Sequence, residues 1–140
     1  MIALLALWIG CQGNDGQTPI SGEVSFDGRP VAQGSIALFP MSGTPGASTG
    51  GKIEAGRYEI AAEDGPQLGG VYRVEIRASR GTGEKVETIE APAGTLVDVY
   101  EQYIPPRYND DSQLQIEIKP AAGEQQYNFT LTSRRAAGGK

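Results

Sequence analysis

The side chains best suited to bind a small ligand crowd into one short run in the second half of the chain. This run, Tyr100-Glu101-Gln102-Tyr103-Ile104-Pro105-Pro106-Arg107-Tyr108-Asn109, is the densest aromatic stretch of the sequence. Aromatic faces stack on sugar rings, and Arg and Asn supply directional hydrogen bonds. The candidate ligand surface therefore consists of Tyr100, Tyr103, Arg107, Tyr108 and Asn109. A structural role fits the same run, with Tyr103, Ile104 and Tyr108 folded over the open end of a small core, and we favour it because a small core needs its aromatics.

Oxygen-bearing side chains follow this run directly. Asn109-Asp110-Asp111-Ser112 offers ligands of the kind that Ca²⁺ uses, but it lacks the alternating spacing of a calcium loop. Asn and Asp are also common turn residues before a strand. We expect no metal site here, and a calcium-stabilised adhesion module stays open as an alternative.

The chain contains no histidine. This removes the commonest general base at neutral pH, the commonest metal ligand and every Ser-His or Cys-His nucleophile. We therefore expect no catalytic residue, no cofactor and no enzyme activity. One enzymatic alternative stays open, a histidine-free enzyme that cleaves an envelope polymer with two facing carboxylates. The acids available for it are Asp98, Glu101, Asp110 and Asp111.

The only cysteine, Cys11, ends an apolar segment at the start of the chain. Residues 2–9 are uninterrupted apolar, about the length of a secretory signal core and well below the roughly 20 residues that span a bilayer. Gly10-Cys11 resembles the lipobox of bacterial lipoproteins, in which a cysteine after a small residue receives a diacylglyceryl group. A buried structural cysteine is the alternative, but the polar residues 12–16 that follow at once disfavour it. We expect a lipid anchor on Cys11 and attachment to a membrane.

The charge balance argues against nucleic acid as a partner. The chain has 12 basic and 17 acidic residues, a net charge of −5, and three of the basic residues lie in its last seven positions. A nucleic-acid-binding surface needs clustered Lys and Arg to neutralise phosphates. We expect no such partner.

Short segments with alternating apolar and polar residues, separated by turn signals, run along the rest of the chain. This period is that of half-buried strands, and no stretch has the period of an amphipathic helix. The clearest segment alternates Tyr72, Val74 and Ile76 with charged residues that we expect to form ion pairs on a solvated face. The pattern predicts an all-β fold, an antiparallel β-sandwich of about seven strands. The connection from 78 to 112 interrupts it, with one further strand expected around residues 86–89.

A family resemblance supports this fold. Three stretches resemble the carboxypeptidase-regulatory-domain or transthyretin-like sandwich. They are Ser21-Gly22-Glu23-Val24 through Val31 to Ile36, Gly56-Arg57-Tyr58, and Gly70-Val71-Tyr72-Arg73-Val74. The run from Tyr103 to Asn109 is similar to one in uncharacterised bacterial lipoproteins that carry such a domain. The hydrolases and iron dioxygenases of this group rely on histidine, so the resemblance implies a non-catalytic use. Its glycines and aromatics specify a fold rather than an activity.

Together these features predict four segments. Residues 1–10 form a lipoprotein signal segment, 11–19 a lipid-anchored tether, 20–132 the β-sandwich domain and 133–140 a flexible tail. We expect a non-catalytic lipoprotein of the cell envelope, on the periplasmic or outer surface. Its domain would serve as a binding or structural accessory module for a carbohydrate or an envelope protein.

Overall fold

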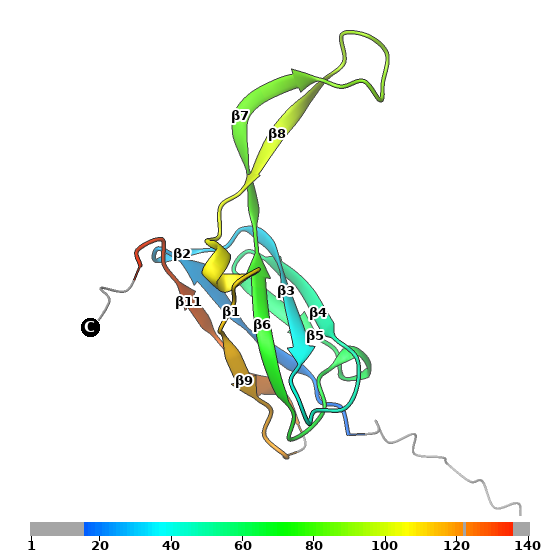
Figure 1. The fold of residues 1–140 in the computed structure, drawn as a ribbon, viewed down its shortest axis with the longest axis vertical. Helices are drawn as coiled ribbons and strands as arrows, with labels where there is room; N and C mark the ends of the chain where they lie inside the picture. The colour runs from blue at the N-terminus through cyan, green and yellow to red at the C-terminus, as the bar shows by residue number, and fades with distance from the viewer. Residues whose placement is uncertain (1–15, 122, 136–140) are drawn as a thin grey trace, which may run out of the picture.

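The computed structural model describes residues 16–121 and 123–135. Over these residues the chain is all-β, with eleven strands, two short 3-10 turns and no α-helix (Figure 1). The strands are β1 Ile20–Phe26, β2 Arg29–Pro30, β3 Gln33–Pro40, β4 Thr49–Glu54, β5 Arg57–Ile60, β6 Val71–Arg77, β7 Ser79–Glu87, β8 Leu96–Gln102, β9 Gln115–Glu117, β10 Gln125–Gln126 and β11 Phe129–Leu131. The 3-10 turns are η1 Ala62–Asp64 and η2 Pro106–Tyr108. No helix of this described part is long and apolar enough to cross a membrane.

Nine of the strands form one curled sheet in the order β10-β1-β5-β4-β3-β6-β9, and β2 and β11 also pair with β1. Most neighbours are antiparallel, as the sequence predicts. The exceptions are β10 and β11, which both run parallel to β1. These two short strands, Gln125–Gln126 and Phe129–Leu131, lie against the first strand of the body.

The core lies inside the curl of this sheet. The predicted alternation is clearest in β6, where every second residue, Tyr72, Val74 and Ile76, is buried. Strands β1, β3, β4, β5, β9 and β11 add their inward residues to the same cluster. Its most buried large side chains are Tyr58, Tyr72, Ile20, Ile36, Leu38, Ile53, Ile76, Ile104, Ile118 and Leu131.

A glycine allows the last strands to approach β1. A Cβ added to Gly22 would lie 1.8 Å from the backbone oxygen of Tyr127, a separation that no side chain could occupy. The hydroxyl of Tyr58 donates to that same oxygen at 2.6 Å. Both contacts depend on the absence of a side chain at position 22.

The connection from 78 to 112 contains a second, two-stranded sheet rather than a single strand around 86–89. Strands β7 and β8 form a hairpin that projects away from the body (Figure 1). We call residues 79–102 the arm. All residues of β7 are exposed, and so are all residues of β8 except the half-buried Val99.

Candidate binding cleft at the base of the arm

Two aromatic residues of the predicted ligand surface, Tyr100 and Tyr103, share a cavity. They line a cleft of about 600 Å³ where the arm leaves the body. Its other walls come from β1, β2, the turn after β4 and the start of β7, through Phe26, Arg29, Pro30, Ala32, Gln33, Ala55, Ser79, Arg80 and Gly81. The cleft therefore lies between the curled sheet and the arm.

Aromatic and cationic side chains organise this cleft. The rings of Phe26 and Tyr103 meet edge to face, with centroids 5.5 Å apart. The guanidinium carbon of Arg80 lies 5.1 Å from the centre of the Tyr103 ring, and its Nε donates to Glu101 at 2.9 Å. Tyr100 stays 66% exposed. This combination of aromatic faces and arginines is typical of the central residues of protein interfaces.

The arm is braced where it meets the cleft. The side-chain amide of Gln102 donates to the carbonyl of Ile104 at 2.9 Å, and its oxygen accepts from the N–H of Ile104 at 2.6 Å. The N–H of Tyr103 donates to the carbonyl of Ala78 at 3.0 Å. These bonds fix the chain at the point where both strands of the arm leave the body.

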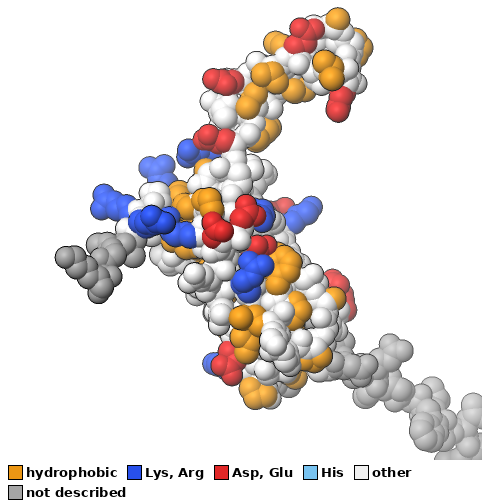
Figure 2. All heavy atoms as spheres, in the orientation of Figure 1, with side chains coloured by type: hydrophobic (Ala, Val, Ile, Leu, Met, Phe, Trp, Pro, Cys, Tyr) orange, Lys and Arg blue, Asp and Glu red, His pale blue; other side chains and the backbone are white. Residues whose placement is uncertain are grey.

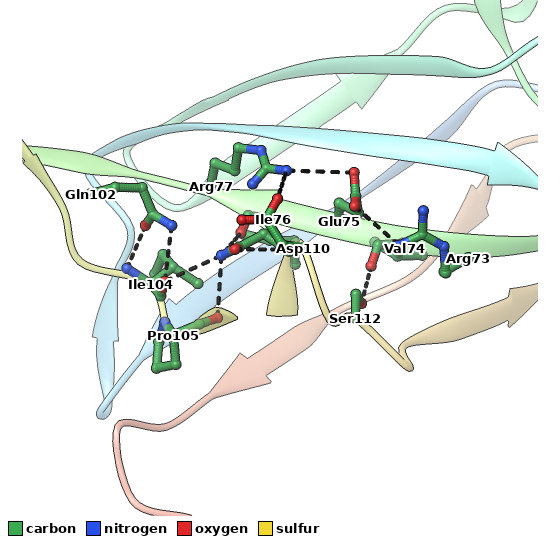
Figure 3. A network of polar contacts seen from close by, with 11 residues as sticks. Arg73, Val74, Glu75, Ile76, Arg77, Gln102, Ile104, Pro105, Asp110 and Ser112 are labelled. Atoms are coloured by element: carbon green, nitrogen blue, oxygen red, sulfur yellow. Dashed lines mark hydrogen bonds and ion pairs between the residues drawn. The ribbon is translucent and has the colours of Figure 1, made fainter. Parts of the chain in front are cut away.

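The remaining three residues of the predicted surface lie outside the cleft. Asn109 is 1% exposed, and its amide donates to the carbonyls of Ile76, Ile104 and Pro105 at 3.1–3.3 Å (Figure 3). It is part of the interior and cannot reach a ligand, so the expectation that it belongs to a ligand surface is corrected. An Asn in a turn sequence can point inward as readily as outward, and here the amide turns inward to three backbone carbonyls.

Arg107 and Tyr108 hold the end of the chain. The guanidinium of Arg107 donates to the carbonyls of Thr132 and Arg134 and stacks over the Tyr108 ring, 4.7 Å from its centre. The hydroxyl of Tyr108 accepts from the N–H of Thr132 at 3.2 Å. Together with the buried Ile104 and the half-buried Tyr103, these contacts correspond to the structural role favoured from the sequence.

The segment from Asn109 to Ser112 joins η2 to β6 through the buried Asn109 and Ser112, while Asp110 and Asp111 are exposed. The hydroxyl of Ser112 donates to the carbonyl of Val74 (Figure 3). It also accepts from the N–H of Leu114. Asp110 accepts from Arg77 at 2.8 Å. Over the part of the chain that the structure describes, no group of three or more metal-ligating side chains occurs.

Three of the four acids of the enzymatic alternative form ion pairs with basic side chains. Asp98 binds Lys85 at 2.6 Å across the arm, and Glu101 binds Arg80. Asp110 and Arg77 continue the charged side of β6, where Glu75 lies between Arg73 and Arg77 at 3.0 and 3.8 Å. The ion pairs expected for β6 therefore run along the strand and toward η2 instead of across the sheet.

Sequence reasoning missed Phe26, Arg29 and Arg80. Phe26 reads as an ordinary strand residue, Arg29 as part of the Asp27–Pro30 turn, and Arg80 as part of a long connection. Only the pairing of β7 with β8 brings Arg80 to Tyr103. A second hollow of about 640 Å³, lined mainly by polar and charged residues of β1, β4 and β5, contains none of the predicted residues.

No protein-family description matches the chain, and no curated protein matches it. Among solved structures, it is similar to a 9R-lipoxygenase from Cyanothece PCC8801, with a TM-score of 0.34 and 16% identity. That match covers 94% of this chain and 18% of the lipoxygenase, so the chain spans about a fifth of that protein's length. Cys11, the predicted lipid anchor, lies outside the described residues.

Proposed function

We propose that this protein is a non-catalytic interaction module of the bacterial cell envelope, whose transthyretin-like β-sandwich carries the arm toward a protein partner. The observation that carries the proposal is the exposure of apolar side chains on the arm. Val86, Ile89, Leu96, Val97 and Tyr100 are all exposed, and Ile89 is fully so. Exposed apolar patches on a soluble domain mark interaction sites.

The stability of the arm supports the same proposal. A two-stranded hairpin is marginally stable in water when no further strand or apolar layer covers it. Here the ion pairs Arg80–Glu101 and Lys85–Asp98 and the hydrogen bond from Thr82 to Val99 tie the strands together, yet neither face is covered. A partner that lies on the arm would provide the missing apolar contact.

The proposed location at the cell envelope depends on a lipid anchor on Cys11. Lipidation of Cys11 would attach the chain to a membrane, and more than one acyl chain is needed for stable attachment. The test is the mass of the N-terminal peptide from the full chain made in a bacterial host, with Cys11→Ser as control. A peptide that begins at Cys11 and carries diacylglyceryl and acyl mass is expected. An unmodified wild-type peptide that begins at Met1 would remove the envelope assignment.

The arm is tested by photo-cross-linking in host cells. A photoreactive amino acid replaces Ile89 at the end of the arm, or Glu63 in η1, which lines neither the arm nor the cleft. We expect a discrete adduct from position 89 and none from position 63. The absence of an adduct at 89, or equal labelling at both positions, would contradict the interaction role of the arm.

A carbohydrate is the second candidate ligand, because Tyr100, Tyr103 and Arg80 do share the cleft. The expected result for a sugar site is saturable binding of envelope oligosaccharides, weakened at least tenfold by Tyr100→Ala and unchanged by Glu63→Ala. Calorimetric titration of the full chain measures it.

A further inference from the structure

The arm carries an excess of negative charge toward its end. Residues 79–102 contain five acids and two bases, and both bases are taken by the ion pairs with Glu101 and Asp98. The remaining acids, Glu84, Glu87 and Glu90, form no ion pair within the described residues. They flank the exposed Val86 and Ile89, so the outer part of the arm is both apolar and acidic.

The body carries the opposite charge beside the base of the arm. Arg29 lines the cleft, and Phe26, its partner in the β1–β2 pair, lines the same cleft. Asp27, between them, accepts from the N–H of Ser133 at 2.8 Å, and Arg107 donates to the carbonyl of Arg134 at 3.0 Å. We call Arg29, Arg107 and Arg134 the basic corner.

None of the three arginines of the basic corner forms an ion pair within residues 16–121 and 123–135, and the acid beside them, Asp27, accepts hydrogen bonds from Ser133 and Thr132. In the space-filling view, Lys and Arg side chains gather on the body just below the arm, and acidic and apolar side chains alternate along the arm (Figure 2). One molecule thus presents an apolar, acidic surface at the end of the arm and an aromatic, basic surface on the body beside the base of the arm.

We propose that two copies of this chain associate through their arms, with the apolar end of each arm in the cleft of the other copy. The acids of each arm then face the basic corner of the other. This inference rests on the proposed function, because it names the protein partner of the arm as a second copy.

Two-fold symmetry makes this arrangement self-consistent. A two-fold axis across the arms sets them antiparallel, so that the end of each lies at the base of the other, and both contacts form at once. The nine residues of β7 span about 30 Å at about 3.3 Å per residue, which separates end and base enough for two distinct contacts. Opposite charges at each contact also set the direction of the arms.

Charge reversal tests the arrangement in the full chain. The protein is purified from host membranes in mild detergent, and its molar mass is measured by light scattering. The wild-type protein is expected to be a dimer whose dissociation constant rises with salt. Arg29→Glu or Glu90→Lys alone should raise that constant at least tenfold, and the double variant should restore it to within about threefold. Glu90 is preferred to Glu87 because the carboxylate of Glu87 accepts from the N–H of Gly94 and shapes the turn.

Glu63→Lys is the matched control and should leave the dimer unchanged. The proposed contact would be overturned if neither single variant raised the dissociation constant, or if the double variant did not restore it. The cross-link from position 89 separates the two proposals. An adduct of twice the chain mass supports the second copy, and an adduct of another mass overturns it while the interaction role of the arm stands. A monomer that gives no adduct would overturn both.

Discussion

At the scale of single residues, the structure gives Arg107, Tyr108 and Asn109 internal contacts and leaves Tyr103 in the cleft. The sequence predicts that residues 103–109 could either bind a ligand or cover the core, and it gives physical grounds for the second role. It cannot show that Asn109 points inward, because the three carbonyls that its amide satisfies come from β6 and from the segment before η2. That convergence depends on tertiary structure and leaves no local pattern.

Substitutions at Asn109 should separate loss of hydrogen bonds from burial of charge. Asn109→Ala removes a buried amide that donates to three carbonyls and should lower the free energy of unfolding by about 1–3 kcal/mol. Asn109→Asp puts a carboxylate against those carbonyls and should cost about 3–5 kcal/mol at neutral pH. Urea denaturation measures both, with Asp111→Ala as the exposed control. Equal stability of the two variants would contradict the proposed hydrogen bonding.

Tyr58 should make the fold sensitive to alkali. Burial raises the pKa of Tyr58 well above its ordinary value of 10.0, and its hydroxyl donates to the carbonyl of Tyr127. The unfolded chain loses this proton near pH 10 while the folded chain keeps it, so the stability contribution is complete below pH 10 and is lost above it.

Tyr58→Phe should therefore cost about 1 kcal/mol at pH 7 but flatten the decline above pH 10. Urea denaturation at both pH values measures this difference, and Tyr100→Phe serves as an exposed control. A variant whose stability falls as steeply as that of the wild type would show that Tyr58 does not cause the decline.

At the scale of elements, the strands that bury one face could be predicted from the sequence, and the arm could not. Alternation marks β1, β3, β5, β6 and β9 because one side of each lies on the core. The arm buries neither side, so Gly81, Thr82, Gly83 and Glu84 show no such period. The cleft could not be predicted either, because its lining combines β1 and β2 with the arm.

Removal of the arm should leave the body folded. Replacement of residues 80–101 by a short Asn-Gly turn deletes no residue of the buried core, so the melting temperature should change by no more than a few degrees. Differential scanning calorimetry measures it. The same variant should lose the cross-linked adduct described above, whereas a fall of 15 degrees or more would show that the arm supports the core.

The contact between the β1–β2 turn and the end of the described chain should weaken in acid. Hydrogen bonds from Ser133 and Thr132, together with the charge of Arg134, lower the pKa of Asp27 below its ordinary value of 3.8. The stabilisation is therefore present above pH 3.8 and is lost as the pH falls below it. The protection factor of the Ser133 amide, which corrects for the intrinsic pH dependence of hydrogen exchange, should fall in that range. Asp27→Asn should exchange with no such transition, and a transition that persists in the variant would rule out Asp27 as its origin.

At the scale of the whole molecule, composition and alternation establish an all-β domain, but the way the sheet closes required the structure. The alternation of Tyr127, Phe129 and Leu131 indicates a strand, but it does not reveal that this strand, β11, and the preceding β10 both run parallel to β1. Which edges of the sheet meet depends on the pairings of all its strands together. Gly22, which permits that meeting, reads in the sequence as one turn-forming residue among many.

The parallel pairing of β11 with β1 also has a consequence for synthesis. The first strand of the body obtains one of its neighbours only from a segment more than 100 positions later, since the Glu23 amide bonds Asn128 across a separation of 105 residues. Contacts between such distant segments form late and slow the folding of a chain. The nascent polypeptide therefore cannot complete its core until residue 131 has emerged from the ribosome, and a chain released before β11 would expose the open edge of β1.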